Sequence, residues 1–171
     1  TDQVEVPAVP RDALPVVTVR PFNTFGPRQS ARAVIPTIIT QVLARKTLRL
    51  GNLDTTRDFT FVDDTVNGFL KAAEASNVNG KTFNLGTGEE IRIGDLAQKI
   101  MQMIGNPVEI TIDPVRLRPG ESEVFRLLSN NSLAREVLGW KPENTFDEGL
   151  EKTIAWIKDH LGLFRGGTYE F

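Results

Sequence analysis

The stretch Val16–Gln29 constrains the fold more than any other part of the chain, because a strand must end inside it. Val16–Val19 contains only β-branched residues, which is typical of a strand covered on both faces, as in a parallel sheet. Pro21 and the Gly-Pro pair that follows forbid its continuation. In open α/β sheets, ligands bind beyond the carboxyl ends of the strands. We therefore expect Asn23 and Arg28 to lie at a binding edge.

The rest of the chain alternates predicted helices with predicted strands, which indicates an α/β fold. Helical spacing of apolar residues predicts helices near 34–46, 63–79, 95–105, 131–138 and 146–160. Further strands are predicted at 48–50, 59–62, 81–85 and 108–112. The strands are few, and two of them are apolar enough to need cover on both faces. This imbalance predicts that the chain is part of a larger fold.

Acidic residues open two of the predicted helices. Asp63 and Asp64 are expected to cap one N-terminus, and Asp95 is expected to cap another. The first of these helices has one apolar face, made of Val66, Phe69, Leu70 and Ala73.

Composition excludes several classes of function. The chain has 171 residues, enough for one domain or for a piece of a larger one, and its net charge of -2 provides no basic field for nucleic acid or an anionic membrane. It has no cysteine and a single histidine, which excludes disulfides, thiolate nucleophiles, Ser-His-Asp triads and His-based metal clusters. No apolar run approaches a membrane span, and no signal peptide opens the sequence. We expect a cytoplasmic protein without a metal.

Two arginines are candidates for binding an anion. Arg57 and Arg118 lie beside turn-forming residues. A guanidinium group can bind a phosphate bidentately, through two parallel N–H···O hydrogen bonds. The alternative is a local ion pair for each arginine, with Asp54 or Asp58 for Arg57 and with Glu121 or Glu123 for Arg118. Gly86–Gly88 could be a phosphate loop, but a lone Gly-x-Gly without a third glycine favours a structural turn.

The chain resembles the NAD-dependent sugar-nucleotide epimerases and dehydratases, which are extended short-chain dehydrogenase/reductases. The resemblance rests on five motifs that occur in the family's order: Arg20–Pro27, Arg57–Asp64, Phe83–Gly88, Arg118–Glu121 and Leu138–Pro142. Each motif is loose alone, whereas the ordered set is highly specific and covers about residues 16–160. The run Pro27–Pro36 is most similar to bacterial 4,6-dehydratases that act on nucleotide-linked N-acetylhexosamines.

The resemblance implies roles for particular residues. Asn23 would donate to the diphosphate of a nucleotide sugar, and Arg57 and Arg118 would clamp it. Glu121 would approach a sugar hydroxyl. The resemblance also implies that the main chain around Pro21 and Phe22 faces the nicotinamide of NAD. The residues expected near the nucleotide base are Val34, Leu48 and Leu50.

The sequence also departs from the family's pattern. The family's activity depends on an N-terminal Rossmann half with a glycine fingerprint for NAD, a Ser or Thr, and a Tyr-x-x-x-Lys pair, none of which occurs here. Residues 1–15 mix charges with three prolines and show no helical or strand period, which predicts a loose arm. By analogy with the family, residues 16–171 are the C-terminal substrate-binding portion with the last strands of a truncated Rossmann sheet. We expect no catalytic residue in this chain and a homodimer for the full-length enzyme. The alternative function is a non-catalytic assembly module that self-associates through an exposed sheet edge.

Overall fold

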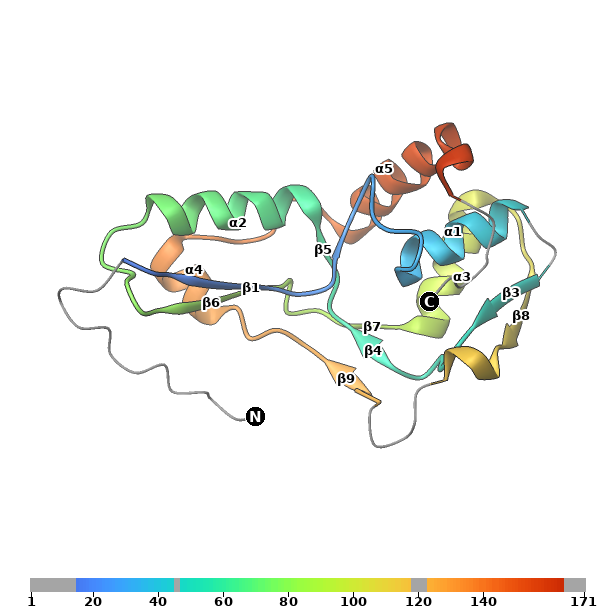
Figure 1. Ribbon diagram of the computed structural model, residues 1–171, viewed down its shortest axis with the longest axis horizontal. Helices are drawn as coiled ribbons and strands as arrows, with labels where there is room; N and C mark the ends of the chain where they lie inside the picture. The colour runs from blue at the N-terminus through green and yellow to red at the C-terminus, as the bar shows by residue number, and fades with distance from the viewer. Residues whose placement is uncertain (1–14, 45–46, 118–122, 165–171) are drawn as a thin grey trace.

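The computed structural model describes residues 15–44, 47–117 and 123–164. The described chain is an elongated α/β body with helices gathered at two ends and short strands between them (Figure 1). The expected arm at residues 1–15 lies almost entirely outside the described residues, and so do Arg118 and Glu121.

One end of the molecule is a small β-α-β unit. Strand β1 (Thr18–Pro21) pairs in parallel with strand β6 (Thr82–Leu85), and helix α2 (Val62–Glu74) lies between them in the sequence. Helix α4 (Ser132–Leu138) packs against β6 and α2. Trp140, which is fully buried, anchors the core of this end.

The predicted strand at the start of this unit exists, but its expected burial is wrong. Thr18, Arg20 and Pro21 are exposed, and Val19 is half-buried. Only the alternate side chains of the pair, such as Phe83, reach the core under the helices. Within the described residues no element covers the second face of β1, which is why its β-branched run is not enclosed.

The other end holds the larger core. Helix α1 (Val34–Ala44) packs against helices α3 (Ile93–Ile104) and α5 (Phe146–Asp159). Beside them, β3 (Thr47–Leu50) pairs in parallel with β8 (Glu109–Ile112). The helical spacing predicted for α1 is confirmed by its buried apolar residues, which are Ile35, Ile38, Ile39 and Val42.

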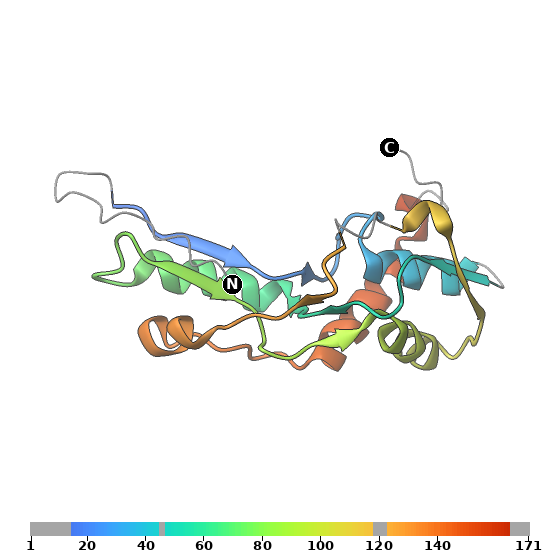
Figure 2. The same ribbon diagram turned by 90° about the horizontal axis from the view of Figure 1, so that it is seen from below.

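Short strands occupy the middle of the molecule (Figure 2). Strand β2 (Thr24–Phe25) pairs in parallel with β5 (Thr60–Phe61). Beside them, β4 (Thr56–Arg57) lies between β7 (Ile91–Arg92) and β9 (Arg126–Leu127). Two 3₁₀ turns, η1 (Pro114–Arg116) and η3 (Leu161–Leu163), complete the described elements.

The acidic residues at two helix starts are not caps. Phe61 and Arg92 occupy the N-cap positions of α2 and α3, and neither end has a side-chain cap bond. Asp64 is buried and accepts hydrogen bonds from the backbone of the 143–144 segment instead, while Asp95 pairs with Arg92. The predicted side-chain caps are therefore wrong, although Asp63, Asp64 and Asp95 do lie in the first turns of their helices.

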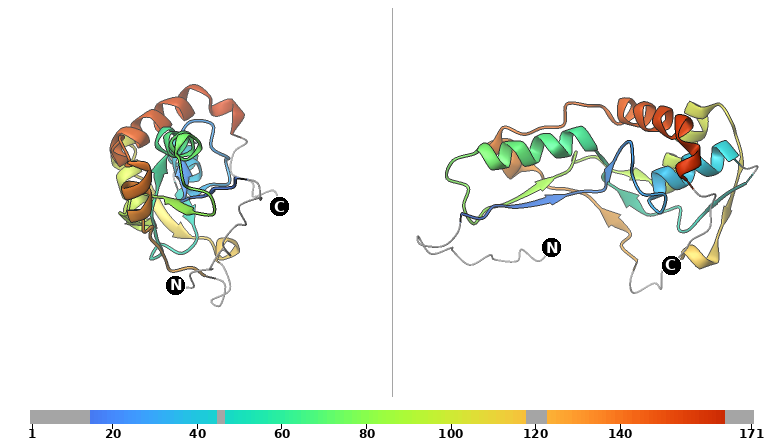
Figure 3. Two further views of the ribbon diagram at one scale, coloured as in Figure 1. Left: turned by 90° about the vertical axis from the view of Figure 1, so that its left-hand side faces the viewer. Right: turned by 45° about the horizontal axis from the view of Figure 1, so that its top comes forward.

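Helix α2 also turns its apolar residues away from the core. It runs along the same long side of the molecule as α5 (Figure 3). Its buried residues are Asp64, Thr65, Gly68 and Ala72. Helix α2 packs tightly against β6 at Gly68, since an added Cβ would collide with the Leu85 side chain. The predicted apolar face is instead exposed, with Val66 at 51%, Phe69 at 48% and Leu70 at 56%.

Candidate functional site

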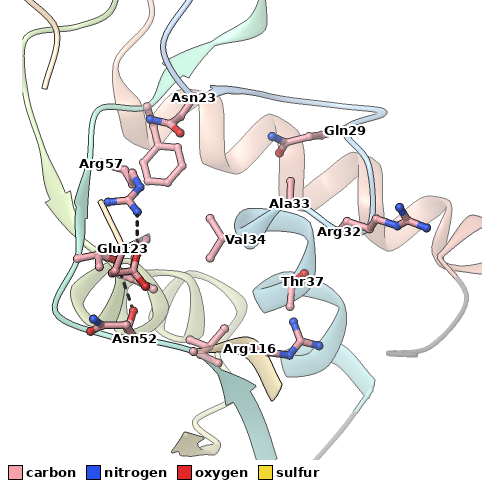
Figure 4. Close-up of a pocket in the computed structure, with 15 residues that line it drawn as sticks. Asn23, Gln29, Arg32, Ala33, Val34, Thr37, Asn52, Arg57, Arg116 and Glu123 are labelled. Carbon is pink, nitrogen blue, oxygen red and sulfur yellow. Dashed lines mark hydrogen bonds and ion pairs between the residues drawn. The ribbon is translucent and has the colours of Figure 1, made fainter. Parts of the chain in front are cut away.

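A cavity of about 350 Å³ lies where the middle strands meet the N-terminus of α1. We call it the Arg57 cavity. Asn23, which precedes β2, and Arg57, the last residue of β4, lie on one side of it, and Val34 and Gln29 lie across from them (Figure 4). Segments that are far apart in the sequence thus contribute polar groups to a single site.

Arg57 is held in place by two contacts. Its Nη1 donates a hydrogen bond to the Thr56 carbonyl oxygen over 2.8 Å, and its Nη2 lies 3.6 Å from a carboxylate oxygen of Glu123. Only 16% of the Arg57 side chain and 10% of the Glu123 side chain are exposed. The local ion pair weighed for Arg57 therefore exists, but its partner is neither Asp54 nor Asp58.

The strand that carries Arg57 is fixed by its neighbours. Thr56 donates from its hydroxyl to Glu90 over 2.6 Å, and Arg126 of β9 donates to the same carboxylate. The hydrogen bonds from Arg126 and Thr56 lower the pKa of Glu90 below its ordinary value. This cross-link ties β4 to β9 on the exposed side of the sheet and limits the movement of Arg57.

Asn23 is oriented by the segment that contains Arg57. Its Nδ2 donates to the Asp58 carbonyl oxygen over 2.9 Å, which leaves the second N–H of the amide for another acceptor. Asn23 and Arg57 are thus positioned by one short piece of backbone.

Asp58 connects this piece of backbone to two other loops. Its fully buried carboxylate accepts hydrogen bonds from the Thr87 and Gly88 backbone N–H groups and from the Ser129 backbone N–H. The Thr87 hydroxyl adds a further bond over 2.7 Å. The Gly86–Gly88 turn does bind an anion, but this anion is the protein's own side chain, which confirms its prediction as a structural turn.

Of the three apolar residues expected near a base, two line the Arg57 cavity and one does not. Val34 and Leu50 line the Arg57 cavity. Leu48 is fully buried in the larger core and is not among the residues that line the cavity. At the end of β1, Pro21 is exposed and Phe22 is half-buried, with the Phe22 N–H donating to the Leu85 carbonyl oxygen.

Sequence reasoning missed several polar residues of the cavity, among them Glu123, Gln29 and Arg116. Glu123 was considered only as a partner of Arg118, whereas Gln29 and Arg116 were not considered as ligand contacts. Arg116 is paired with Asp113 over 3.4 Å. No spacing in the sequence relates these residues to Arg57, so only the packing of the loops identifies them.

Groups of metal ligands and membrane-spanning helices are both absent from the described residues. In residues 15–44, 47–117 and 123–164, no group of three or more His, Asp or Glu side chains is placed to hold a metal ion. None of the helices described there is long and apolar enough to cross a membrane.

The fold and its similarity to solved structures identify the class of protein. The described chain has the mixed α/β architecture of Rossmann-like epimerases of the extended short-chain dehydrogenase type. An epimerase from Methanothermobacter thermautotrophicus superimposes with a TM-score of 0.80 at 33% identity, over 89% of this chain and 46% of that one. The Bacillus cereus UDP-glucuronic acid 4-epimerase, solved in complex with UDP-glucuronic acid and NAD, gives a TM-score of 0.78 at 29% identity, over 85% and 46% of the two chains.

Sequence comparison identifies the family. A family model described as GDP-mannose 4,6 dehydratase matches residues 10–153, and the chain belongs to this family. The UDP-glucose 4-epimerase of Mycolicibacterium smegmatis is 36% identical over 145 residues, which are 82% of this chain and 45% of that protein. The human dTDP-D-glucose 4,6-dehydratase is 31% identical over 153 residues, covering 86% and 43%. The chain thus spans less than half the length of these relatives.

Proposed function

We propose that this chain is the substrate-binding part of an NAD-dependent sugar-nucleotide 4,6-dehydratase or 4-epimerase. The observation that carries the proposal is the convergence of Asn23 and Arg57 on one cavity in a chain of this family. A nucleotide diphosphate needs charge and directed N–H groups, and the two side chains provide both.

The remaining cavity residues suit the rest of such a ligand. Val34 and Leu50 offer apolar surface for a base. Arg118 would complete the clamp on the diphosphate and Glu121 would accept a sugar hydroxyl, and both closely follow Arg116, which lines the cavity. Leu48 is fully buried and does not line the cavity, so it would not contact the base.

NAD belongs to the proposal for the whole enzyme. Bound NAD would accept a hydride from the sugar and return it later. The exposed end of β1 is compatible with a cofactor facing Pro21 and Phe22. Several of the solved structures similar to this chain contain NAD or NADPH, which supports a nicotinamide cofactor. The acid-base residues would come from outside this chain, so its own role is to bind and orient the substrate.

Two surface features support a contact with further protein. Strand β1 has an unpaired edge within the described residues, and α2 exposes Phe69 and Leu70 on the same unit. An exposed apolar stripe beside an open strand edge is the surface that an adjoining NAD-binding half would cover. The proposal includes a homodimer of the whole enzyme. It also includes a cytoplasmic location, with which the absence of cysteine is compatible.

Calorimetry with UDP-glucose and dTDP-glucose tests the site. Arg57→Lys keeps a positive charge beside Glu123 but loses the planar fork, so we expect binding to weaken about tenfold, or about 1.4 kcal/mol. Arg118→Ala should weaken it by about 1.5–3 kcal/mol, the scale of one charged hydrogen-bonding group. The control is Arg92→Lys, since Arg92 pairs with Asp95 on the surface and does not line the cavity. Equal affinities in all four proteins would refute the proposed clamp.

Self-association is the second candidate function, because the open edge of β1 is a template for strand pairing. Analytical ultracentrifugation distinguishes self-association from the substrate-binding function. A concentration-dependent dimer of a chain that binds no nucleotide sugar would favour the assembly module.

A further inference from the structure

The Arg57 cavity contains one feature that a site for an anion does not need. Three of its lining residues are arginines, Arg32, Arg57 and Arg116, yet Glu123 places a carboxylate among them. Glu123 is the one acidic residue among the described residues that line the cavity. A carboxylate in this position repels any phosphate that approaches Arg57.

The contact between Glu123 and Arg57 is loose. Its 3.6 Å separation exceeds the ~2.7–2.9 Å of a strong charge-assisted hydrogen bond. The Thr56 carbonyl oxygen holds Arg57 independently, at 2.8 Å. The Thr56 carbonyl oxygen thus anchors one side of the guanidinium, and most of its five N–H groups have no strong acceptor among the contacts described above.

Burial explains why a carboxylate is nevertheless present. The two side chains are 16% and 10% exposed, and a mostly buried guanidinium without a counter-ion would be costly. Glu123 supplies this counter-ion for Arg57. A ligand phosphate that binds Arg57 would make this carboxylate redundant, and the two anions would then compete for one guanidinium.

We propose that Glu123 is the intramolecular counter-ion of Arg57, which a ligand phosphate must displace, and that it thereby sets the affinity of the cavity for anionic ligands. The inference rests on the proposed function and deepens it. Displacement favours ligands that bring two linked phosphates over those with one, since a diphosphate replaces the lost ion pair and still has oxygens for Asn23.

The test compares UDP binding by the unmodified chain, Glu123→Gln and Asp95→Asn. Glutamine keeps the shape of Glu123 but removes the competing charge, so we expect the dissociation constant for UDP to fall about tenfold. UMP binding should tighten at least as much, which would reduce the preference for UDP. Asp95→Asn removes the same charge from an arginine pair outside the cavity, and should leave both constants unchanged.

Each outcome decides the matter. Tighter binding in Glu123→Gln alone supports the inference, also where the unmodified chain binds too weakly to measure. Binding of UDP by the unmodified chain with no gain in Glu123→Gln, or an equal gain in Asp95→Asn, overturns the inference and leaves the proposed function standing. If no variant binds UDP at millimolar concentration, both fail.

A measurement on the unmodified chain covers the case in which the variant does not fold. In an NMR titration with UDP, the carboxyl carbon signal of Glu123 should shift. The dissociation constant fitted to this shift should equal the one fitted to the Arg57 side-chain signals. Arg57 signals that shift while the Glu123 signal stays fixed would overturn displacement.

Discussion

The two ends of the molecule bury their apolar residues to very different extents. At the α1 end, Ile35, Ile38 and Leu150 are fully buried between three helices. At the β1 end, Trp140 and Phe83 are equally buried, yet the helix above them exposes an apolar stripe. The α1 end thus has the larger enclosed core, whereas the β1 end combines a small core with a helix whose apolar side chains are exposed.

The Arg57 cavity lies between the two ends and depends on both. Asn23 follows β1 of the small unit, while Val34 opens α1 of the large one. Asp58, next to Arg57, accepts hydrogen bonds from the loop after β6 and from the loop before α4. The comparison therefore predicts which substitutions affect one end, which affect the site, and which affect only the surface.

Trp140→Ala should have the largest effect. The side chain is fully buried, and its Nε1 donates to the Asp64 carbonyl oxygen over 2.9 Å. We expect a loss of about 3–5 kcal/mol in the free energy of unfolding, measured by urea denaturation. If the two cores are separate, hydrogen exchange should accelerate in α2, β6 and α4 but not in α1. Equal acceleration in α1 would show that the cores unfold as one unit.

Asp58→Asn should have the next largest effect, because an amide nitrogen would face backbone N–H groups that now donate to the carboxylate. We expect a loss of about 3 kcal/mol, the scale of a hydrogen bond to a charged group. The exposed Asp63→Asn is the control and should stay within about 0.5 kcal/mol. A neutral Asp58→Asn would contradict the linking role of this carboxylate.

Phe69→Ser tests the open surface of α2. Because this side chain is 48% exposed, we expect the free energy of unfolding to change by no more than about 0.5 kcal/mol. Binding of a hydrophobic dye should decrease clearly. Ala72→Ser, on the buried side of the same helix, should instead cost about 1–3 kcal/mol. A large loss in Phe69→Ser would mean that the stripe contributes to the core.

Glu148→Gln should have the smallest effect and should depend on pH. Hydrogen bonds from the Thr145 backbone and hydroxyl lower the pKa of Glu148 below its ordinary value. A lowered pKa contributes stability above the unfolded-state value, and this contribution is lost as the pH falls through the folded-state value. Glu148→Gln should therefore be less stable at pH 7, with the difference shrinking below about pH 4. Glu151→Gln, exposed on the same helix, is the control for removal of a charge.

Elements whose causes are local could be predicted from the sequence. Helical spacing predicted α1, α4 and α5, and Gly105 ends α3 in the left-handed conformation, as a C-terminal glycine does. The ordered motifs identified the family, and the motif beginning at Arg57 supplied a residue of the cavity.

Which faces are buried and which charges meet depends instead on tertiary packing. The β-branched run of β1 and the apolar stripe of α2 looked like core residues, but burial depends on what packs against a face and not on its composition alone. Likewise, Arg57 and Glu123 are separated by 66 positions, more than any local pairing rule spans, and chain folding alone brings them to 3.6 Å.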